Sequence, residues 1–233
     1  MKQKNLPLYY TLLKKIYVGL IYPFIASYIK KERAFHYKGL HLQIFPGVFH
    51  PGFFFSTKFF FAFISKLDLE NKSCLEIGCG SGLLSLVMSR KKARVTAIDM
   101  NPLAIKNTRL NYELNKVELE DEFTVLQSDM FQNLEPQRYD CIIVAPPYFF
   151  TDPKNDNEHA WFCGKNGEYF YKLFSGLATY FSAHTAMYMI LADNCDLERI
   201  QKIAAESGYS FELAAKKRIW WEENYIFKIS KNA

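Results

Sequence analysis

A glycine-rich segment carries the residues of this chain whose types and spacing best suit cofactor binding. Residues 74–82 read CLEIGCGSG, in which an apolar run ends in an acid, Glu76, and in three alternating glycines. Glycine permits positive φ angles and lacks a Cβ atom, so a ligand can approach the main chain at each of them. The apolar residues 83–88 predict the start of a helix, whose first N–H groups have no partner within the helix. The pattern therefore predicts a strand, a turn and a helix that together hold a ligand.

The spacing of these glycines differs from that of a dinucleotide-binding fingerprint. In that fingerprint the third glycine follows the second by three residues, which here would be position 83. Residue 83 is leucine, so a dehydrogenase is the least favoured enzyme class. Glycines that serve only the packing of a turn remain the structural alternative.

Acids follow two further predicted strands. Asp99 ends the strand at 94–98, and a carboxylate there can accept hydrogen bonds from both hydroxyls of a ribose. Asp129 can accept a hydrogen bond from an adenine amino group, while the neighbouring Met130 can lie against the ring. The structural alternatives are a helix cap for Asp99 and a surface turn for Asp129.

The most specific feature follows the fourth predicted strand, where residues 145–148 read APPY. Two consecutive prolines carry no N–H group, and each pushes its predecessor into an extended conformation. The carbonyls of Ala145 and Pro146 can accept the hydrogens of an amino group and aim its lone pair at an electrophilic methyl group. Tyr148 offers a flat face for a planar substrate. Positioning alone can lower such a barrier by about 7–11 kcal/mol in favourable cases, so no acid or base is required.

The composition fits one generous domain, or one domain with an extension. The chain has 233 residues, of which 49% are hydrophobic, so it can bury a core without disulfides. Its five cysteines form no C-x-x-C pair, which favours a reducing, cytoplasmic location and gives no reason to expect a metal site.

The positive charge is concentrated near the N-terminus. Residues 1–50 hold eight lysines and arginines against one acid, and the whole chain carries a net charge of +5. Such a segment can approach phosphates or anionic lipid, or it can be a solvated helix face. The apolar run at 16–29 is too short to span a bilayer, so we expect no transmembrane segment. We expect residues 1–50 to form a basic, aromatic extension with a helix and a short β element, and residues 51–233 to form the catalytic domain.

Strand and helix patterns alternate through the body of the chain. This alternation predicts an α/β fold with a doubly wound, mostly parallel sheet and ligands beyond the carboxyl ends of its strands. A hairpin or two edge strands are expected at 35–49, and an antiparallel hairpin at the C-terminus. The predicted strands are 73–77, 94–98, 123–127, 141–145, 186–192, 211–217 and 225–229, and the predicted helices are 56–66, one directly after residue 82, 101–115, 167–181 and 196–206.

Taken together, these motifs resemble the HemK/RsmC-type "small domain" branch of the class I S-adenosylmethionine-dependent methyltransferases. The resemblance covers about residues 35–230 and implies a Rossmann-like seven-stranded sheet. The matching pieces are FPGVF at 45–49, residues 76–82, Asp99 with Asn101 and Pro102, Asn107, Asn111, Asp129, the proline pair with Tyr148, and GKNG at 164–167.

The resemblance also implies roles for individual residues. The three glycines would line the methionine part of S-adenosylmethionine, Asp99 its ribose and Asp129 its adenine, and the Pro-Pro-Tyr strip would hold the target nitrogen. The cofactor-binding residues predicted on this basis are Glu76, Gly78, Cys79, Gly80, Gly82, Asp99, Met100, Asp129 and Met130. The predicted catalytic residues are Ala145, Pro146, Pro147 and Tyr148.

The resemblance implies methylation of an amino or amide nitrogen, in RNA or DNA first and in protein glutamine second. The basic extension favours RNA. The family usually has Asn, Asp or Ser where this chain has Ala145, so a side-chain acceptor for the target amine is missing. Two alternatives follow: a small-molecule methyltransferase in which Trp161, Phe162 and the segment 16–29 close the acceptor pocket, or a cofactor-binding module with little turnover.

Overall fold

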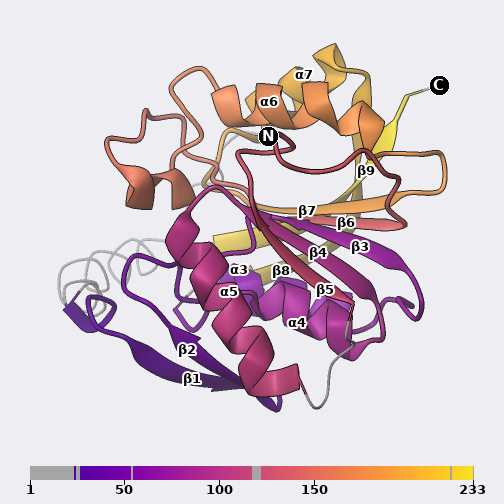
Figure 1. The fold of residues 1–233 in the computed structure, drawn as a ribbon. Coiled ribbons are helices and arrows are strands. Elements are labelled where there is room, and N and C mark those ends of the chain that lie inside the picture. Colours follow the sequence, from indigo (N-terminus) through magenta and orange to yellow (C-terminus); the bar gives the residue numbers. More distant parts are fainter. Residues whose placement is uncertain (1–23, 25–26, 54, 117–121, 221, 233) are drawn as a thin grey trace.

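A seven-stranded sheet forms the centre of the molecule (Figure 1). The computed structural model describes residue 24 and residues 27–53, 55–116, 122–220 and 222–232. The strands are β1 Arg33–Tyr37, β2 Leu40–Ile44, β3 Ser73–Ile77, β4 Arg94–Asp99, β5 Phe123–Gln127, β6 Cys141–Val144, β7 Ala186–Ala192, β8 Tyr209–Ile219 and β9 Glu222–Lys231. The helices are α3 Phe55–Ile64, α4 Leu83–Arg90, α5 Pro102–Asn115, α6 Glu168–Gly176 and α7 Leu197–Glu206, with 3-10 turns at Asp156–Ala160 and Leu177–Thr179.

The sheet has the order β5-β4-β3-β6-β7-β9-β8. Strands β3 to β7 are parallel, whereas β9 runs antiparallel to both β7 and β8. From β3 the chain winds outward through β4 to β5, and then returns to β6 on the other side of β3. Ligands bind beyond the strand ends where the winding direction reverses, so this topology directs attention to the ends of β3 and β6. The predicted α/β sheet with a C-terminal antiparallel hairpin is confirmed.

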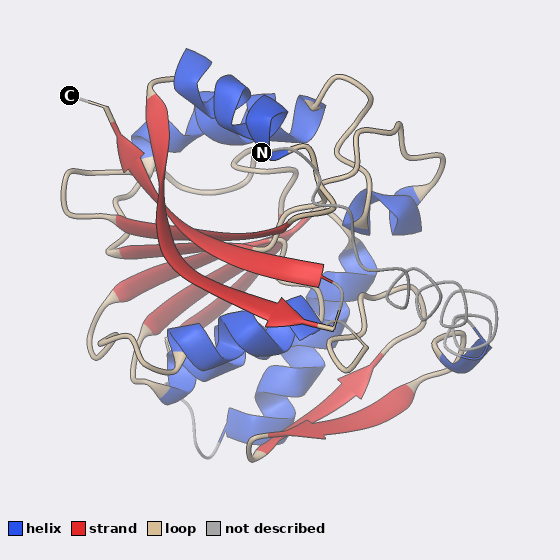
Figure 2. Ribbon diagram, turned by 180° about the vertical axis from the view of Figure 1, so that it is seen from behind, coloured by secondary structure: helices blue, strands red, loops and turns tan. Residues whose placement is uncertain are grey.

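Helices cover both faces of the sheet (Figures 1 and 2). Helices α3, α4 and α5 lie on one face and α6 and α7 on the other. Each face has its own apolar core: Phe60 and Leu86 belong to the first, and Phe170 and Ile200 to the second. Strands β3 and β6 contribute to both cores, because a central parallel strand is buried on both sides.

Predicted boundaries differ most from the observed ones at one helix and in the C-terminal hairpin. The helix expected at 167–181 ends at Gly176 and continues as a 3-10 turn. The backbone at Gly176 lies against the ring of Phe131, which would be 2.6 Å from a Cβ atom. The C-terminal strands are longer than predicted, because Ile219 pairs with Glu222 and the ladder includes residues that were expected in the turn.

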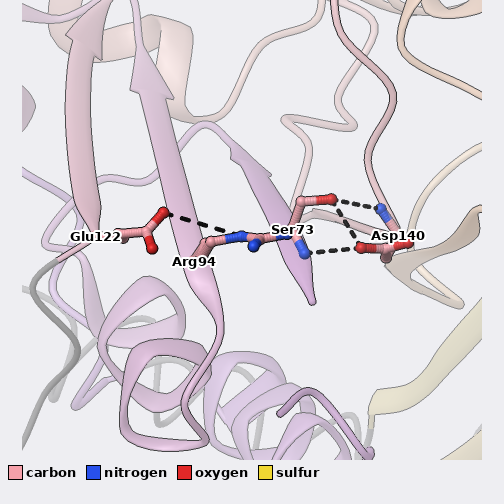
Figure 3. Close-up of polar contacts among 4 residues, drawn as sticks. All are labelled: Ser73, Arg94, Glu122 and Asp140. Carbon is pink, nitrogen blue, oxygen red and sulfur yellow. Dashed lines mark hydrogen bonds and ion pairs between the residues drawn. The ribbon is translucent and has the colours of Figure 1, made fainter. Parts of the chain in front are cut away.

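Opposite the carboxyl ends, a polar clamp sets the register between β3 and β6 (Figure 3). The backbone N–H and the hydroxyl of Ser73 both donate to the carboxylate of Asp140, each at 2.8 Å. The N–H of Ser73, as the largest cause, holds the pKa of Asp140 below its usual range. Beside this clamp, Arg94 lies 3.9 Å from Glu122 at the starts of the neighbouring strands. The register of the two strands is therefore fixed at the end of the sheet remote from their carboxyl ends.

Strands β1 and β2 form the predicted N-terminal hairpin. Its turn has positive φ at both Lys38 (51°) and Gly39 (83°), as tight two-residue hairpins require. The predicted helical segment 16–29 lies largely outside the described residues, and the domain boundary at residue 50 stays a prediction. None of the helices in the described ranges has the length and apolar character needed to cross a bilayer.

An asparagine ladder on α5 holds this hairpin to the body of the protein. Asn107, Asn111 and Asn115 follow one another at four-residue spacing, and each side-chain oxygen accepts a backbone N–H of the β2 segment. The donors are Phe45 (3.0 Å), Gln43 (2.7 Å) and His41 (2.9 Å). Four residues of helix rise about 6.0 Å and two residues of strand about 6.6 Å, so the two repeats stay in register over three steps.

The middle asparagine also reaches the glycine-rich turn. The amide nitrogen of Asn111 donates to the carbonyl of Ser81 at 2.8 Å. Asn111 is fully buried, so both of its partners lose their hydrogen bonds if the amide is removed. The hairpin, α5 and the turn after β3 are thereby joined through one side chain.

Replacing Asn111 with alanine is therefore expected to lower the free energy of unfolding by about 2–4 kcal/mol, because two buried backbone groups lose their partners. Urea denaturation followed by circular dichroism measures the change. Lys106→Ala, at an exposed position of the same helix, is the control and should change stability by less than about 0.5 kcal/mol. A loss below about 1 kcal/mol in Asn111→Ala would contradict the role of the ladder.

Candidate functional site

The turn between β3 and α4 has three positive φ angles. They are 79° at Gly78, 55° at Gly80 and 81° at Gly82, conformations that side chains other than glycine rarely adopt. The N–H groups of Gly78 and Cys79 both donate to the carbonyl of Ile98 on β4, at 2.8 and 3.0 Å. These two hydrogen bonds hold the turn to the neighbouring strand β4.

The glycines differ in what surrounds them. A Cβ atom added at Gly78 or Gly80 would meet no atom of the described residues within 4 Å, so a ligand can lie against the backbone there. A Cβ atom at Gly82 would lie 2.9 Å from Thr108, and Gly82 is outside the cavity lining. A role for Gly82 in binding the cofactor stays a prediction, while the structure shows that this glycine lets the turn pack closely against α5.

Glu76 lies beneath the turn and is almost completely buried. Its carboxylate accepts hydrogen bonds from the hydroxyl and the backbone N–H of Ser85, on the first turns of α4. Burial nevertheless raises the pKa of Glu76 to about 8, with a smaller contribution from the negative charge of Asp99. A carboxyl group with such a pKa can change its protonation state when a cationic ligand binds beside it.

Asp99 joins the end of β4 to the turn. Its two carboxylate oxygens accept the N–H groups of Gly80 and Asn101, each at 2.9 Å. Burial raises the pKa of Asp99, and the backbone N–H groups partly oppose that effect. The backbone N–H groups of Gly80, Asn101 and Met100 leave lone-pair capacity on the carboxylate, which can accept a hydroxyl of a ribose.

Asp129 and Met130 follow β5 on the same edge of the sheet. The carboxylate of Asp129 lies 2.7 Å from the Nζ atom of Lys172 on α6. Met130 has a positive φ of 52°, which is unusual for a residue with a side chain. Its carbonyl accepts the hydroxyl of Ser128 at 2.7 Å, so the loop is held in this conformation.

The strip 145–148 follows β6 at the switch point. Ala145 is exposed, whereas Pro146 and Pro147 are buried and Tyr148 is half-buried against the core beneath α6. Burial raises the pKa of Tyr148 well above its usual value, so the phenol stays neutral. Within the described part of the chain, no residue donates a hydrogen bond to the carbonyls of residues 145–147. The strip therefore offers carbonyl acceptors that are free for a ligand.

A cavity of about 490 Å³ connects these groups. Of the thirteen predicted site residues, all except Gly82 line it: Glu76, Gly78, Cys79, Gly80, Asp99, Met100, Asp129, Met130, Ala145, Pro146, Pro147 and Tyr148. The cavity thus places the glycine turn, the two acids and the strip 145–148 around one space. Within the described residues there is no cluster of His, Cys, Asp and Glu side chains that could hold a metal ion.

A loop after the strip closes one side of the cavity. The N–H of Phe149 donates to the carbonyl of Trp161 at 3.1 Å, and the N–H of Cys163 donates back to Phe149 at 2.9 Å. The ring of Trp161 lies 5.2 Å from that of Phe49, in the segment after β2. Trp161 and Phe162 both line the cavity, as the small-molecule alternative requires, but the segment 16–29 that it also invokes is mostly outside the described residues.

Sequence reasoning missed the contribution of α6. Glu168, Tyr169 and Lys172 line the cavity from this helix, and the enclosed hydroxyl of Tyr169 has no hydrogen-bond partner among the described residues. The family pattern ends at Gly167, so no motif marks these side chains. Lys172 follows Tyr169 by three residues and Glu168 by four, so it neighbours both on the helix surface, which is the signal that could have revealed them.

Comparison with known proteins agrees with this geometry. A family model described as "methyltransferase small domain" matches residues 40–162, a little over half of the chain. A relative from Methanocaldococcus jannaschii carries the provisional name protein N5-glutamine methyltransferase. It is 28% identical over 193 residues, which cover 80% of this chain and 93% of that relative.

Solved structures share the fold at low sequence identity. A ribosomal protein L11 methylase from Lactobacillus delbrueckii subsp. bulgaricus has a TM-score of 0.60 at 17% identity, over 82% of this chain and 84% of that chain. An N2 methyltransferase of 16S rRNA from T. thermophilus, solved with AdoMet and guanosine, has a TM-score of 0.62 at 18% identity. That match covers 87% of this chain but only half of the T. thermophilus protein. The chain belongs to the methyltransferase small domain family and is a methyltransferase that uses S-adenosylmethionine.

Proposed function

We propose that this protein transfers a methyl group to the side-chain amide nitrogen of a protein glutamine. The observation that carries the proposal is that the carbonyl strip 145–148 lines the same cavity as the glycine turn and Asp99. A methyl donor on the glycine turn and a planar acceptor nitrogen on the strip can therefore occupy the same cavity. The relative named for N5-glutamine methylation supports this acceptor, because the match covers most of both chains.

The residues around the cavity fit S-adenosylmethionine. Gly78 and Gly80 leave bare backbone where a Cβ atom would extend into open space. Asp99 would accept the ribose hydroxyls, Asp129 the adenine amino group, and Glu76 would lie beneath the cationic methionine part. When bound, S-adenosylmethionine supplies an electrophilic methyl group on a positively charged sulfur.

The strip 145–148 would hold the acceptor nitrogen. Its carbonyls accept the N–H hydrogens of a planar amide and so orient the nitrogen, while Tyr148 lies beside the amide plane. Transfer would form the N–C bond and break the C–S bond, and the carbonyl dipoles would stabilise the positive charge on the nitrogen. The nitrogen then gives up one proton to solvent. Orientation is the main contribution expected of these residues, because the methyl donor is already activated.

The second candidate acceptor is an exocyclic amine of an RNA base. Its support is the basic extension, with eight cationic residues among residues 1–50. The same strip could hold a base amine, since such an amine also presents two hydrogens beside a planar ring.

All five cysteines are free thiols, which supports a reducing location such as the cytoplasm.

Placing a methyl group on the glycine turn should block the cofactor. We expect Gly78→Ala to weaken binding of S-adenosylhomocysteine at least tenfold in calorimetric titration, because its Cβ atom enters the cavity. The matched control is Gly208→Ala, since Gly208 has nearly the same φ (80° against 79°) and equally open surroundings but lies outside the cavity. Equal affinity in the two variants would contradict the proposed cradle.

Cofactor binding should depend on pH through Glu76. Below a pKa of about 8 its carboxyl is protonated, and only the ionised form attracts a cationic ligand. We therefore expect the affinity for S-adenosylmethionine to rise up to about pH 8 and to level off above it. Glu76→Gln should show a flatter profile and weaker binding at pH 9.

The stability of the free protein should follow the opposite trend. Because the folded pKa of Glu76 lies above its unfolded value of 4.5, folding takes up a proton between about pH 4.5 and 8, and stability falls as pH rises through that window. Glu76→Gln should lack this loss, as thermal unfolding at several pH values can measure. A wild-type binding profile that is flat from pH 6 to 9 would remove the assigned role of Glu76.

The acceptor can be identified with radiolabelled S-adenosylmethionine and cell extract. Label in protein that acid hydrolysis releases as methylamine is expected for glutamine. Label in nuclease-digested RNA would instead support the second candidate, and label in neither macromolecule would contradict both.

Once the acceptor is identified, Ala145→Asn should raise kcat/KM about tenfold by adding one hydrogen bond, while Ala205→Asn, on an exposed face of α7, should leave kcat/KM unchanged.

A further inference from the structure

Lys172 on α6 makes an ion pair with one of the acids in the cavity. Its Nζ atom lies 2.7 Å from Oδ2 of Asp129, and both residues line the cavity. The side chain of Lys172 is 55% exposed and that of Asp129 is 34% exposed. The pair therefore connects α6, which carries no recognised motif, to the loop after β5.

Packing fixes α6 against this loop at a second point. The backbone of Gly176 lies against the ring of Phe131, so a side chain at residue 176 would force the helix away. Tyr180 stacks on the same ring with centroids 4.6 Å apart, and its hydroxyl donates to the carbonyl of Leu134 at 2.8 Å. These contacts lie one turn and more beyond Lys172, so they set the position from which the lysine reaches Asp129.

The backbone on both sides of Asp129 is also fixed. The hydroxyl of Ser128 donates to the carbonyl of Met130 and accepts the N–H of Asn133 at 3.1 Å. Met130 is held in a left-handed conformation that costs free energy and persists only where the surroundings require it. The main remaining freedom at this position is rotation of the Asp129 side chain, and the ion pair restricts that rotation.

We propose that Lys172 is a positioning residue for adenine recognition. By taking Oδ2, the lysine orients the Asp129 carboxylate so that Oδ1 is left to accept the 6-amino group of adenine. Lysine has only donors, so the carboxylate is the acceptor that the pair can offer to a ligand. A base with a carbonyl at position 6 would bring one acceptor against another and bind less well. This inference rests on the adenine role proposed for Asp129.

Calorimetric titration with two ligands can test the proposal. One ligand is S-adenosylhomocysteine, and the other is its analogue with hydrogen in place of the 6-amino group. Both are titrated into the wild-type chain, Lys172→Met, Asp129→Asn and the double variant. Lys202→Met, at an exposed position of α7, is the control, and thermal unfolding reports whether each variant is folded.

For Lys172→Met we expect affinity for S-adenosylhomocysteine to fall about fivefold, near the upper limit for a partly exposed ion pair. The analogue should bind this variant and the wild type equally, and the double variant should bind no worse than Asp129→Asn. Equal weakening of both ligands, no change, or tighter binding would overturn the proposal. A wild-type chain that binds neither ligand would instead refute the proposed cofactor site itself.

Discussion

The site depends on one constraint, which is that the chain must turn sharply after β3 while its backbone stays open to a ligand. Positive φ angles at Gly78 and Gly80 allow the turn, and the absent side chains leave the space. The hydrogen bond from the N–H of Gly80 to Asp99 then ties the turn to the end of β4. One carboxylate thereby both fixes the turn and presents its remaining lone pairs to the cavity. The strip 145–148 faces the same space because β6 lies beside β3.

Helices on both faces of the sheet hold this arrangement. On one face, the asparagines of α5 bind alternate residues of the β2 segment, and Asn111 extends the contact to Ser81 in the turn. On the other face, α6 is seated on the loop after β5 through Gly176, which brings Lys172 to Asp129. Side chains of α5 thus hold a strand and the glycine turn, whereas Lys172 of α6 holds the loop after β5. At the amino ends of the strands, the pairing of Ser73 and Asp140 fixes the register between β3 and β6.

The sequence was sufficient for features that depend on local residue types. The strands 73–77, 123–127 and 186–192 were predicted with their observed bounds, since buried apolar runs between polar turns define them. Twelve of the thirteen predicted site residues line one cavity, because the carboxyl ends of parallel strands share an edge. Gly82 does not line that cavity, and its lack of a side chain allows close contact with Thr108, which is 26 residues away in the chain. The roles of α6 and Gly176 also depend on such long-range packing, which a local pattern does not encode.

The central claim is that the glycine turn binds the methyl donor and the strip 145–148 binds the acceptor, both within one cavity. Amide chemical shifts of the isotope-labelled chain, recorded during titration with S-adenosylhomocysteine, test it most directly. The account predicts saturable shifts at Gly78, Gly80 and Tyr148, which border the cavity, and none at Ser73 and Asp140, at the amino ends of the strands. Shifts confined to the amino ends, or a folded protein whose spectrum does not respond, would contradict it.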